Sequence, residues 1–330
     1  MELYNRMMDA QFAYELLKKK DYIFLSAKVQ SQQGNDEEKR GTRVKNDLNP
    51  VKCFEVEYFC KGTSVESKIE EGFRIIEGKG CEKEFASLRK KDMYCFIEEL
   101  NLICKNIVID FTLMNTRFLG AFVALLNMFE WGEVYFCYTE PGEYNKDEYK
   151  EINLKNTIMG FEQIPNLETF SDSSTKCDWV IFLGFEGSRM IRLNGEAPTR
   201  KRYSLPYISI PAMRTKWHNI AMNANREFFE LKITDQEKMN YVSAINPFET
   251  YERLINISKD VRLVISPIGP KPVMLGCIMY VLENENEMLL YDNPFQEGSN
   301  TTDYGASHFY DLTQFVHSVK NKRYIVEEES

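Results

Sequence analysis

Residues 266–271, with the sequence SPIGPK, have the composition of an anion-binding turn. They separate an apolar, strand-like run from an apolar, helix-like run, so we predict a strand-to-helix turn. Gly269 would let a backbone N–H approach an anion without a Cβ in the way. Lys271 would add positive charge where the helix dipole already favours a negative group. The turn therefore suits a phosphate or a carboxylate. The alternative is a rigid connection whose lysine points into water.

Two further predicted turns place an arginine after an apolar run. The first carries Thr112 and Arg117, and the second carries Gly184, Gly187 and Arg189. Arginine binds phosphate through two parallel hydrogen bonds, whereas lysine acts as a point charge. Because the carboxyl ends of parallel strands collect along one edge of a sheet, we expect the cations of all three turns to converge on one anion-binding site.

Two carboxylates and two tyrosines complete the candidate site. Asp110 ends an apolar run, and Glu186 lies between two glycines. Either could act as a general base, hold a ribose hydroxyl or orient an arginine. For Asp110, capping of the following helix is the structural alternative. Turns are also predicted at residues 138–141 and 291–294, at the ends of two further apolar runs. Their tyrosines, Tyr138 and Tyr291, could stack on a base, or they could pack at the edge of the core, which is common for aromatic residues at strand ends.

Five apolar runs are predicted to be the buried strands that position these turns, at residues 107–111, 134–138, 179–183, 261–266 and 287–291. Strands that are apolar on both faces are typical of parallel sheets. The order strand, turn, apolar helix, strand occurs twice and predicts two β-α-β units. The fold class is therefore α/β, with doubly wound, mainly parallel sheets built from two Rossmann-like units. The predicted halves are residues 1–170 and 171–330, either as two domains or as one continuous domain.

The remaining segments are predicted mainly from their composition. Strands are expected at residues 22–29 and 53–60. The polar residues 30–50 are predicted to form a loop, and the charged residues 61–91 to form solvated helix and loop. The basic, proline-punctuated residues 196–219 are predicted to form a long surface excursion between the two units.

Composition narrows the class of protein. Of the 330 residues, 43% are hydrophobic and 13% aromatic, enough for a sizeable core. The formal net charge of -9 argues against nucleic acid as a general partner, and the basic residues 199–216 are expected to be a solvated loop of open role. No apolar run approaches the roughly 20 residues that span a bilayer, and the N-terminal residues do not resemble a signal peptide. We therefore expect a soluble, cytoplasmic protein without membrane contact.

Cysteine and histidine spacing predicts neither a disulfide framework nor a metal site. The eight cysteines form no C-x-x-C pair, and several lie inside apolar runs where a thiol acts as a small hydrophobe. The three histidines, His218, His308 and His317, show no zinc-ligand spacing. No cofactor is predicted.

The segments VIDFTLMNTRFLGAFVALL and VISPIGPKPVMLGCIMYVL resemble the ligand turn of CARF and SAVED domains. Those Rossmann-like sensors bind cyclic nucleotides in prokaryotic antiviral defence, and their turn is often a threonine- and glycine-rich loop with a lysine that opens a helix. The matching positions are Thr112 and Arg117 in the first segment, and Gly269 and Lys271 in the second. The resemblance implies a nucleotide sensor. Because no nuclease or other effector motif is evident, such a sensor would need a protein partner.

Three functions stay open at this point. The first is a nucleotide- or phosphate-ligand-binding, sensor-like protein of a prokaryotic defence or regulatory system, with an anionic small molecule as ligand and another protein or a second copy as partner. The second is an enzyme acting on a nucleotide or phosphorylated substrate, with Asp110 or Glu186 as general base and with Arg189 and Lys271 as charge stabilisers. The third is a non-catalytic assembly subunit whose ligand site binds nothing.

Overall fold

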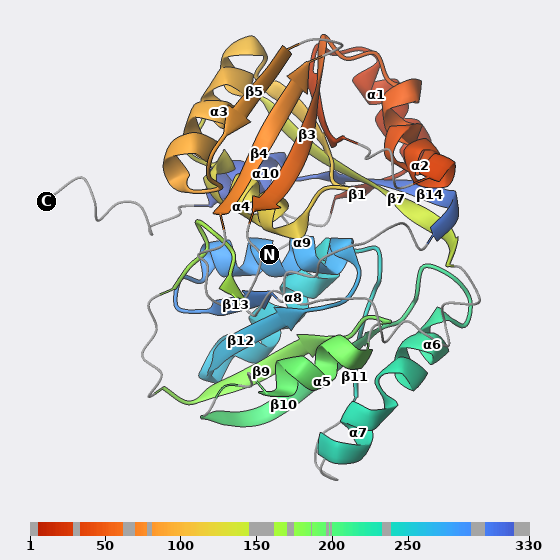
Figure 1. The fold of residues 1–330 in the computed structure, drawn as a ribbon, viewed down its shortest axis with the longest axis vertical. Helices are drawn as coiled ribbons and strands as arrows, with labels where there is room; N and C mark the ends of the chain where they lie inside the picture. Colours follow the sequence, from red (N-terminus) through yellow and green to blue (C-terminus); the bar gives the residue numbers. More distant parts are fainter. Residues whose placement is uncertain are drawn as a thin grey trace, which may run out of the picture. The chain divides into compact units, whose positions relative to one another are not determined.

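The computed structural model describes residues 6–28, 34–61, 70–77, 81–144, 162–169, 175–185, 187–195, 198, 200–232, 239–291 and 301–319. These ranges form helices and two β-sheets, which confirms the α/β class. Figure 1 shows the two compact units into which the chain divides. Unit 1 consists of Met1–Tyr144 and Gly298–Val319, and unit 2 of Asn145–Glu297 and Lys320–Ser330. Within the described ranges, no helix is long and apolar enough to cross a membrane.

Unit 1 contains a mixed sheet with the strand order β1-β14-β7-β6-β2-β3-β4-β5 among the described residues. The four central strands, β7, β6, β2 and β3, run parallel, and the outer pairings are antiparallel. The strands are β1 (Met7–Met8), β2 (Ile23–Ala27), β3 (Lys52–Lys61), β4 (Glu70–Glu77), β5 (Cys81–Phe85), β6 (Asn106–Asp110), β7 (Glu133–Tyr144) and β14 (Thr301–Asp311). The helices are α1 (Ala10–Leu17), α2 (Gly34–Asp47), α3 (Lys90–Ile103), α4 (Thr116–Leu126) and α10 (Thr313–Ser318).

Helices cover both faces of the unit 1 sheet. On one face, α1 and α2 pack over a core cluster that includes Phe24, Val108 and Cys137. On the other face, α3 and α4 contact Phe73 of β4 through Phe96 and Phe118, with ring centroids 5.5 and 5.2 Å apart. Figure 1 shows α1 and α2 on one side of β3 and β4, and α3 on the other. The chain therefore leaves β2 through α2 in one direction along the sheet, and leaves β6 through α4 in the opposite direction.

Unit 2 contains a mostly parallel sheet with the strand order β11-β10-β9-β12-β13-β8 among the described residues. Only the outermost of these pairings, between β13 and β8, is antiparallel. The strands are β8 (Glu162–Gln163), β9 (Cys177–Phe182), β10 (Lys201–Ser209), β11 (Asn240–Val242), β12 (Arg262–Pro267) and β13 (Met288–Tyr291). The helices are α5 (Gly187–Gly195), α6 (Trp217–Ala224), α7 (Arg226–Lys232), α8 (Pro247–Ile257) and α9 (Lys271–Glu283), with the 3-10 turn η2 (Ser258–Asp260).

The core of unit 2 lies on both faces of this sheet. On one face, Trp179 and Ile181 of β9 pack with Met190 of α5 and Phe228 of α7. Helix α9 contacts β12, β13 and α8, and all its residues from Pro272 to Leu282 are buried. A helix that is apolar all round has to be enclosed by other elements, which is consistent with its place between the sheet and α8.

The five predicted apolar strands are confirmed as β6, β7, β9, β12 and β13. The two predicted β-α-β units are also present, because β6 and β7 are neighbouring parallel strands joined through α4, and β12 and β13 are neighbouring parallel strands joined through α9. The strands expected at residues 22–29 and 53–60 correspond to β2 and β3.

Three predicted loop or helix segments are wrong. Residues 34–47 form α2, whose buried positions include Arg40 and Gly41, so that its apolar pattern is weak. Residues 70–77 and 81–85 form β4 and β5, in which charged residues alternate with buried ones such as Phe73 and Ile75. Residues 201–209 form β10, which lies between β9 and β11 and is not a surface excursion.

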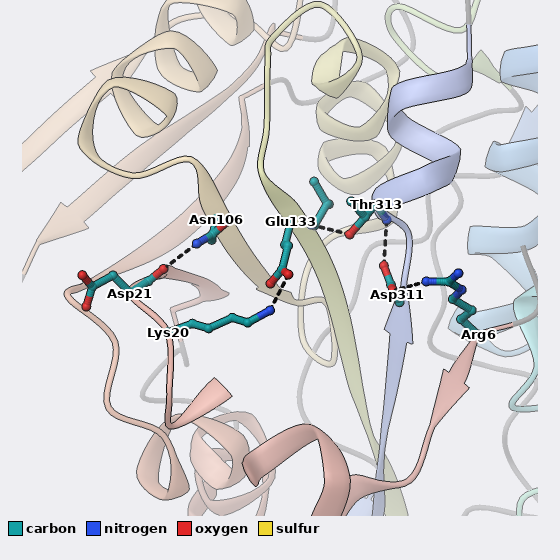
Figure 2. A network of polar contacts seen from close by, with 8 residues as sticks. Arg6, Lys20, Asp21, Asn106, Glu133, Asp311 and Thr313 are labelled. Carbon is teal, nitrogen blue, oxygen red and sulfur yellow. Dashed lines mark hydrogen bonds and ion pairs between the residues drawn. The ribbon is translucent and has the colours of Figure 1, made fainter. Parts of the chain in front are cut away.

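A polar network fixes the amino ends of β6 and β7 (Figure 2). The side-chain amide of Asn106 donates to the carbonyl oxygen of Asp21 over 2.8 Å, and Lys20 forms an ion pair with Glu133. Both contacts tie the segment before β2 to the starts of β6 and β7, which places β2 beside β6.

The same network holds the end of β14. The hydroxyl oxygen of Thr313 accepts the N–H of Val134 over 3.0 Å, and the Thr313 N–H donates to Asp311 over 3.0 Å. Asp311 also contacts Arg6 over 3.4 Å (Figure 2). Because each of these residues contacts another residue of the network, we assign this edge a structural role. In α/β sheets, ligands bind at the opposite edge, outside the carboxyl ends of the strands.

Candidate functional site

The predicted ligand turns follow strands of two different sheets. The turns at residues 110–117 and 138–141 belong to unit 1, and those at 184–189, 266–271 and 291–294 to unit 2. The prediction that all the cations share one sheet edge is therefore wrong. Apolar runs indicate which strands are buried, but they carry no information about which strands pair.

In unit 2, the structure brings two of the predicted turns together. We call residues 183–185 and Gly187 the β9 turn, and residues 268–271 the β12 turn. The Ile268 N–H donates to the carbonyl oxygen of Phe182 over 2.9 Å. A Cβ on Gly184 would lie 2.5 Å from the carbonyl oxygen of Ile268, so that only glycine fits where the two backbones touch. The close contact gives this glycine a packing role.

Two predicted cations lie in or directly after these turns. Lys271 is half-buried at the first position of α9, and Arg189 is buried in the first turn of α5. Pro270 and Pro272 have no N–H group, so the start of α9 has fewer amide donors than most helices. An anion at the β12 turn would therefore depend more on side-chain charge than on helix amides.

A residue that the sequence did not single out, Asn225, links the β9 turn to the junction of α6 and α7. Its side chain is buried, and its amide nitrogen donates to the carbonyl oxygens of Gly184 and Ala221, each over 2.8 Å. At the same junction, a Cβ on Gly187 would lie 1.7 Å from the carbonyl oxygen of Ala224. Asn225 is 41 positions from Gly184 in sequence, and no local pattern indicates this contact.

In unit 1, the Asp110 carboxylate closes the turn after β6. It accepts the N–H of Thr112 over 2.9 Å, and the Thr112 hydroxyl oxygen accepts the N–H of Thr139 over 2.9 Å. The alternative in which Asp110 caps the following helix is wrong, because Asn115 is the N-cap of α4. Burial, together with the charge of Asp110, holds the pKa of the Cys137 thiol well above its usual value. Asp110 therefore lies in a buried polar cluster.

Arg117 forms a buried ion pair within unit 1. Its Nε lies 2.5 Å from Oε1 of Glu71, and its Nη2 donates to Oε2 over 2.8 Å. The Tyr58 hydroxyl donates to the same carboxylate over 2.8 Å. The guanidinium charge is thus compensated by a carboxylate of the chain itself.

The chain does not turn at residues 138–141, which is a correction to the sequence prediction. Strand β7 continues to Tyr144 because it pairs with the antiparallel strand β14 along this stretch. Tyr138 is buried, with its ring centroid 5.5 Å from that of Phe111, and its hydroxyl oxygen accepts a hydrogen bond from Arg40 over 3.3 Å. These contacts give Tyr138 a packing role at the edge of the core.

The remaining predicted site residues are Tyr291 and Glu186. Tyr291 is nearly buried at the end of β13. Glu186 and residues 292–294 lie outside the described residues.

A histidine–carboxylate pair lies on the neighbouring strands β7 and β14. His308 Nε2 and Glu140 Oε1 are 2.6 Å apart, and both side chains are nearly buried. Within the described ranges, no group of three or more histidine, cysteine or acidic residues is arranged to hold a metal ion. The pair contributes a hydrogen bond between two strands rather than a metal site.

The predicted site residues therefore divide between the two units. Unit 2 holds Gly184, Gly187, Arg189, Gly269, Lys271 and Tyr291, and unit 1 holds Asp110, Thr112, Arg117 and Tyr138. The structure places the β9 and β12 turns in direct backbone contact. No protein-family model, no curated protein and no solved structure matches the chain.

Proposed function

We propose that the protein binds a nucleotide or another phosphate-bearing small molecule at the β9 and β12 turns of unit 2, and that it acts as a sensor-like receptor. The observation that carries this proposal is the reversal of strand order between β9 and β12. The chain places β10 and β11 on one side of β9, then returns to place β12 and β13 on the other side. In parallel α/β sheets, ligands bind outside the carboxyl ends of the strands at such a reversal.

The proposal includes a doubly wound, Rossmann-like fold for unit 2. Support comes from the parallel order β11-β10-β9-β12-β13 and from the helices on both faces of the sheet. In unit 1, a reversal of the same kind lies between β2 and β6. Its carboxyl-end residues Asp110, Thr112 and Thr139 bond to one another, which makes unit 2 the better candidate for ligand binding.

The charge at the β9 and β12 turns suits an anionic ligand. Arg189 and Lys271 bring two positive charges to the turns of a protein whose net charge is negative. Gly184, Gly269 and Lys271 are partly exposed, so this part of unit 2 reaches solvent. Tyr291, at the end of the neighbouring strand β13, is the candidate to contact a base.

The biological setting is proposed on the resemblance alone. The turns at Thr112–Arg117 and Gly269–Lys271 resemble those of CARF and SAVED sensors, and on this basis we propose that the receptor acts in a prokaryotic defence or regulatory system. A sensor of this kind would pass its signal to a protein partner or to a second copy of itself.

A non-catalytic assembly subunit is the second candidate function. It is favoured by the contact between Gly187 and Ala224, because the α6–α7 junction fills space beside the β9 turn. In that case the strand reversal would be retained for folding, with no ligand.

A thermal-shift screen with nucleotides, dinucleotides and cyclic oligonucleotides tests the proposal. A ligand present at 100 times its dissociation constant stabilises the folded protein by about 2.7 kcal/mol, which gives a measurable shift. Chromatography of the bound compound then separates a receptor, which returns it unchanged, from an enzyme, which converts it. If no anionic compound shifts the unfolding temperature, the assembly subunit becomes the better assignment.

A further inference from the structure

We infer that Arg214, which follows the carboxyl end of β10, binds a phosphate group of the ligand. This inference rests on the proposed function, because it adds a contact from a third strand to the site assigned to the β9 and β12 turns. We call residues 210–216, between β10 and α6, the β10 loop.

Arg214 carries a buried hydrogen-bond donor that the chain does not use. Its side chain is half-buried, and among the described residues its Nε has no hydrogen-bond partner. By contrast, Nε and Nη2 of Arg202 both donate to the carboxylate of Asp178, over 3.0 and 2.9 Å. Buried donors are nearly always bonded, so an exception indicates an acceptor from outside the chain, such as a ligand or water.

The β10 loop leaves the sheet at its ligand-binding edge. Strand β10 runs parallel to β9, and β9 runs parallel to β12, so the loops after all three strands lie at the same edge of the sheet. In parallel α/β sheets, ligands bind at that edge. Trp217, three positions after Arg214, meets Phe185 of the β9 turn edge-on, with ring centroids 5.6 Å apart. The end of the β10 loop therefore lies beside the β9 turn.

Backbone hydrogen bonds anchor the β10 loop at both ends. The Ile210 N–H donates to the carbonyl oxygen of Val242, in β11, over 2.8 Å. The Trp217 N–H donates to the carbonyl oxygen of Arg214 itself over 3.2 Å. A contact made from an anchored backbone costs less conformational entropy on binding than one made from a loose segment. The β10 loop is therefore a suitable support for a ligand-binding side chain.

The chemistry of Arg214 suits a phosphate group. A guanidinium binds two phosphate oxygens through parallel N–H groups, and it stays protonated throughout the physiological pH range. Because the side chain is only half-buried, it can turn toward a ligand, and no hydrogen bond of Nε within the described residues has to break. Lys216, which is exposed in the same loop, adds a second positive charge. A phosphate on Arg214 would supply the acceptor that its Nε lacks.

Arg214→Met tests the inference through two measurements on the full-length protein. Methionine keeps an unbranched apolar side chain but removes the charge and the donors. Isothermal titration with ATP and with inorganic pyrophosphate should give an affinity about ten- to a hundred-fold lower than that of the unchanged protein. Thermal unfolding without ligand should give the same or a higher midpoint temperature, because the variant has lost a buried donor without an acceptor.

Two further variants serve as controls. Arg226→Met also removes one positive charge from unit 2, but its side chain is 77% exposed, so the affinity should stay unchanged. Arg214→Lys keeps the charge but cannot bind two oxygens in parallel. Its affinity should therefore lie between those of the unchanged protein and Arg214→Met.

The outcomes separate a failure of this inference from a failure of the proposed function. If the unchanged protein binds a probe and Arg214→Met binds it equally well, the contact with Arg214 is refuted while the proposed function stands. The contact is refuted likewise if Arg226→Met weakens binding as much, or if Arg214→Met unfolds at a clearly lower temperature, which would show a structural role. If the unchanged protein binds neither probe, the proposed function is itself contradicted for these anions, and the contact with it.

Discussion

Arg117 and Glu71 form a two-point ion pair between the start of α4 and strand β4. The two contacts measure 2.5 and 2.8 Å, and the side chains are 4% and 11% exposed. The sequence suggested that Arg117 could bind a ligand, but the pair links a helix on one face of the unit 1 sheet to the sheet itself. Removing one partner of a buried ion pair is strongly destabilising, so we expect the loss of either residue to lower the stability of unit 1.

Glu71→Gln should lower the free energy of unfolding by about 3–5 kcal/mol, because it removes the negative charge that faces the buried guanidinium of Arg117. Urea denaturation followed by circular dichroism measures the change. Glu99→Gln is the control, since it breaks the ion pair with Lys83, in which both side chains are about half exposed. It should cost less than about 1 kcal/mol. Equal losses in the two variants would contradict a structural role for the buried pair.

Thr313→Val should destabilise unit 1 by about 1–3 kcal/mol. The substitution nearly preserves the shape of the side chain but leaves the Val134 N–H, at the start of β7, without its acceptor. Thr42→Val is a matched control in α2, where the hydroxyl only donates to the carbonyl oxygen of Glu38 within the same helix. Thermal unfolding of both variants gives the comparison. If the two variants lose the same amount of thermal stability, the hydrogen bond between Val134 and Thr313 does not stabilise the start of β7.

Glu287→Gln should make the protein more stable at pH 7. Burial raises the pKa of Glu287 above its usual value, although the hydrogen bond from the Leu263 N–H favours the ionised form. The pKa of Glu287 is higher in the folded than in the unfolded protein. Its stabilising contribution is therefore fully present at pH values below the pKa of the unfolded protein. It is lost as the pH rises through the folded pKa. The ionised, buried carboxylate therefore costs stability at pH 7, and glutamine removes that cost.

Urea denaturation at several pH values between 4 and 7 tests whether the pKa of Glu287 is raised in the folded protein. The advantage of Glu287→Gln should grow from acid to neutral pH, whereas Glu252→Gln, at an exposed position on α8, should show no such trend. An advantage that is largest at pH 4 would contradict the assignment of a raised pKa.

The buried strands were predictable because their signal is local. In β6, β9 and β12, apolar residues occur on both faces, and such runs need covering from both sides. Helix α2 shows the opposite case, since its buried positions follow helical spacing but include Arg40 and Gly41 beside Val44. Strand β10 was missed because it carries the basic residues at its start and Pro206 within it, features that argue against a central strand.

The sequence predicted the individual turns of the candidate site, but not which of these turns lie together. Glycine and a cation after an apolar run indicate a possible ligand turn wherever they occur, but strand order decides which turns meet. The sequence contains no signal that separates Arg117 from Lys271, although they follow strands of different sheets. The contact between Asn225 and Gly184 likewise depends on tertiary packing across 41 positions.

Lys271→Ala should weaken the binding of ATP or pyrophosphate about ten- to a hundred-fold, the usual effect of losing a charge-assisted contact. The reason is local: Pro270 and Pro272 remove amide donors from the start of α9, so that the lysine side chain has to supply more of the attraction. The side chain is only half-buried, so the free energy of unfolding should fall by about 1 kcal/mol or less. Isothermal titration and urea denaturation measure the two quantities on the same protein sample.

Lys259→Ala, an exposed position in η2 of the same unit, is the matched control for general loss of positive charge. If both lysine variants weaken binding equally, the attraction is a general charge effect, and the β12 turn is not the site. If Lys271→Ala leaves the affinity for the anion and the free energy of unfolding unchanged, the lysine side chain points into solvent and has no role in binding. A loss of several kcal/mol in stability would instead identify Lys271 as one half of a structural ion pair, because its partner would be left buried and unpaired. Only weaker binding with nearly unchanged stability, confined to Lys271, supports a ligand contact at this turn.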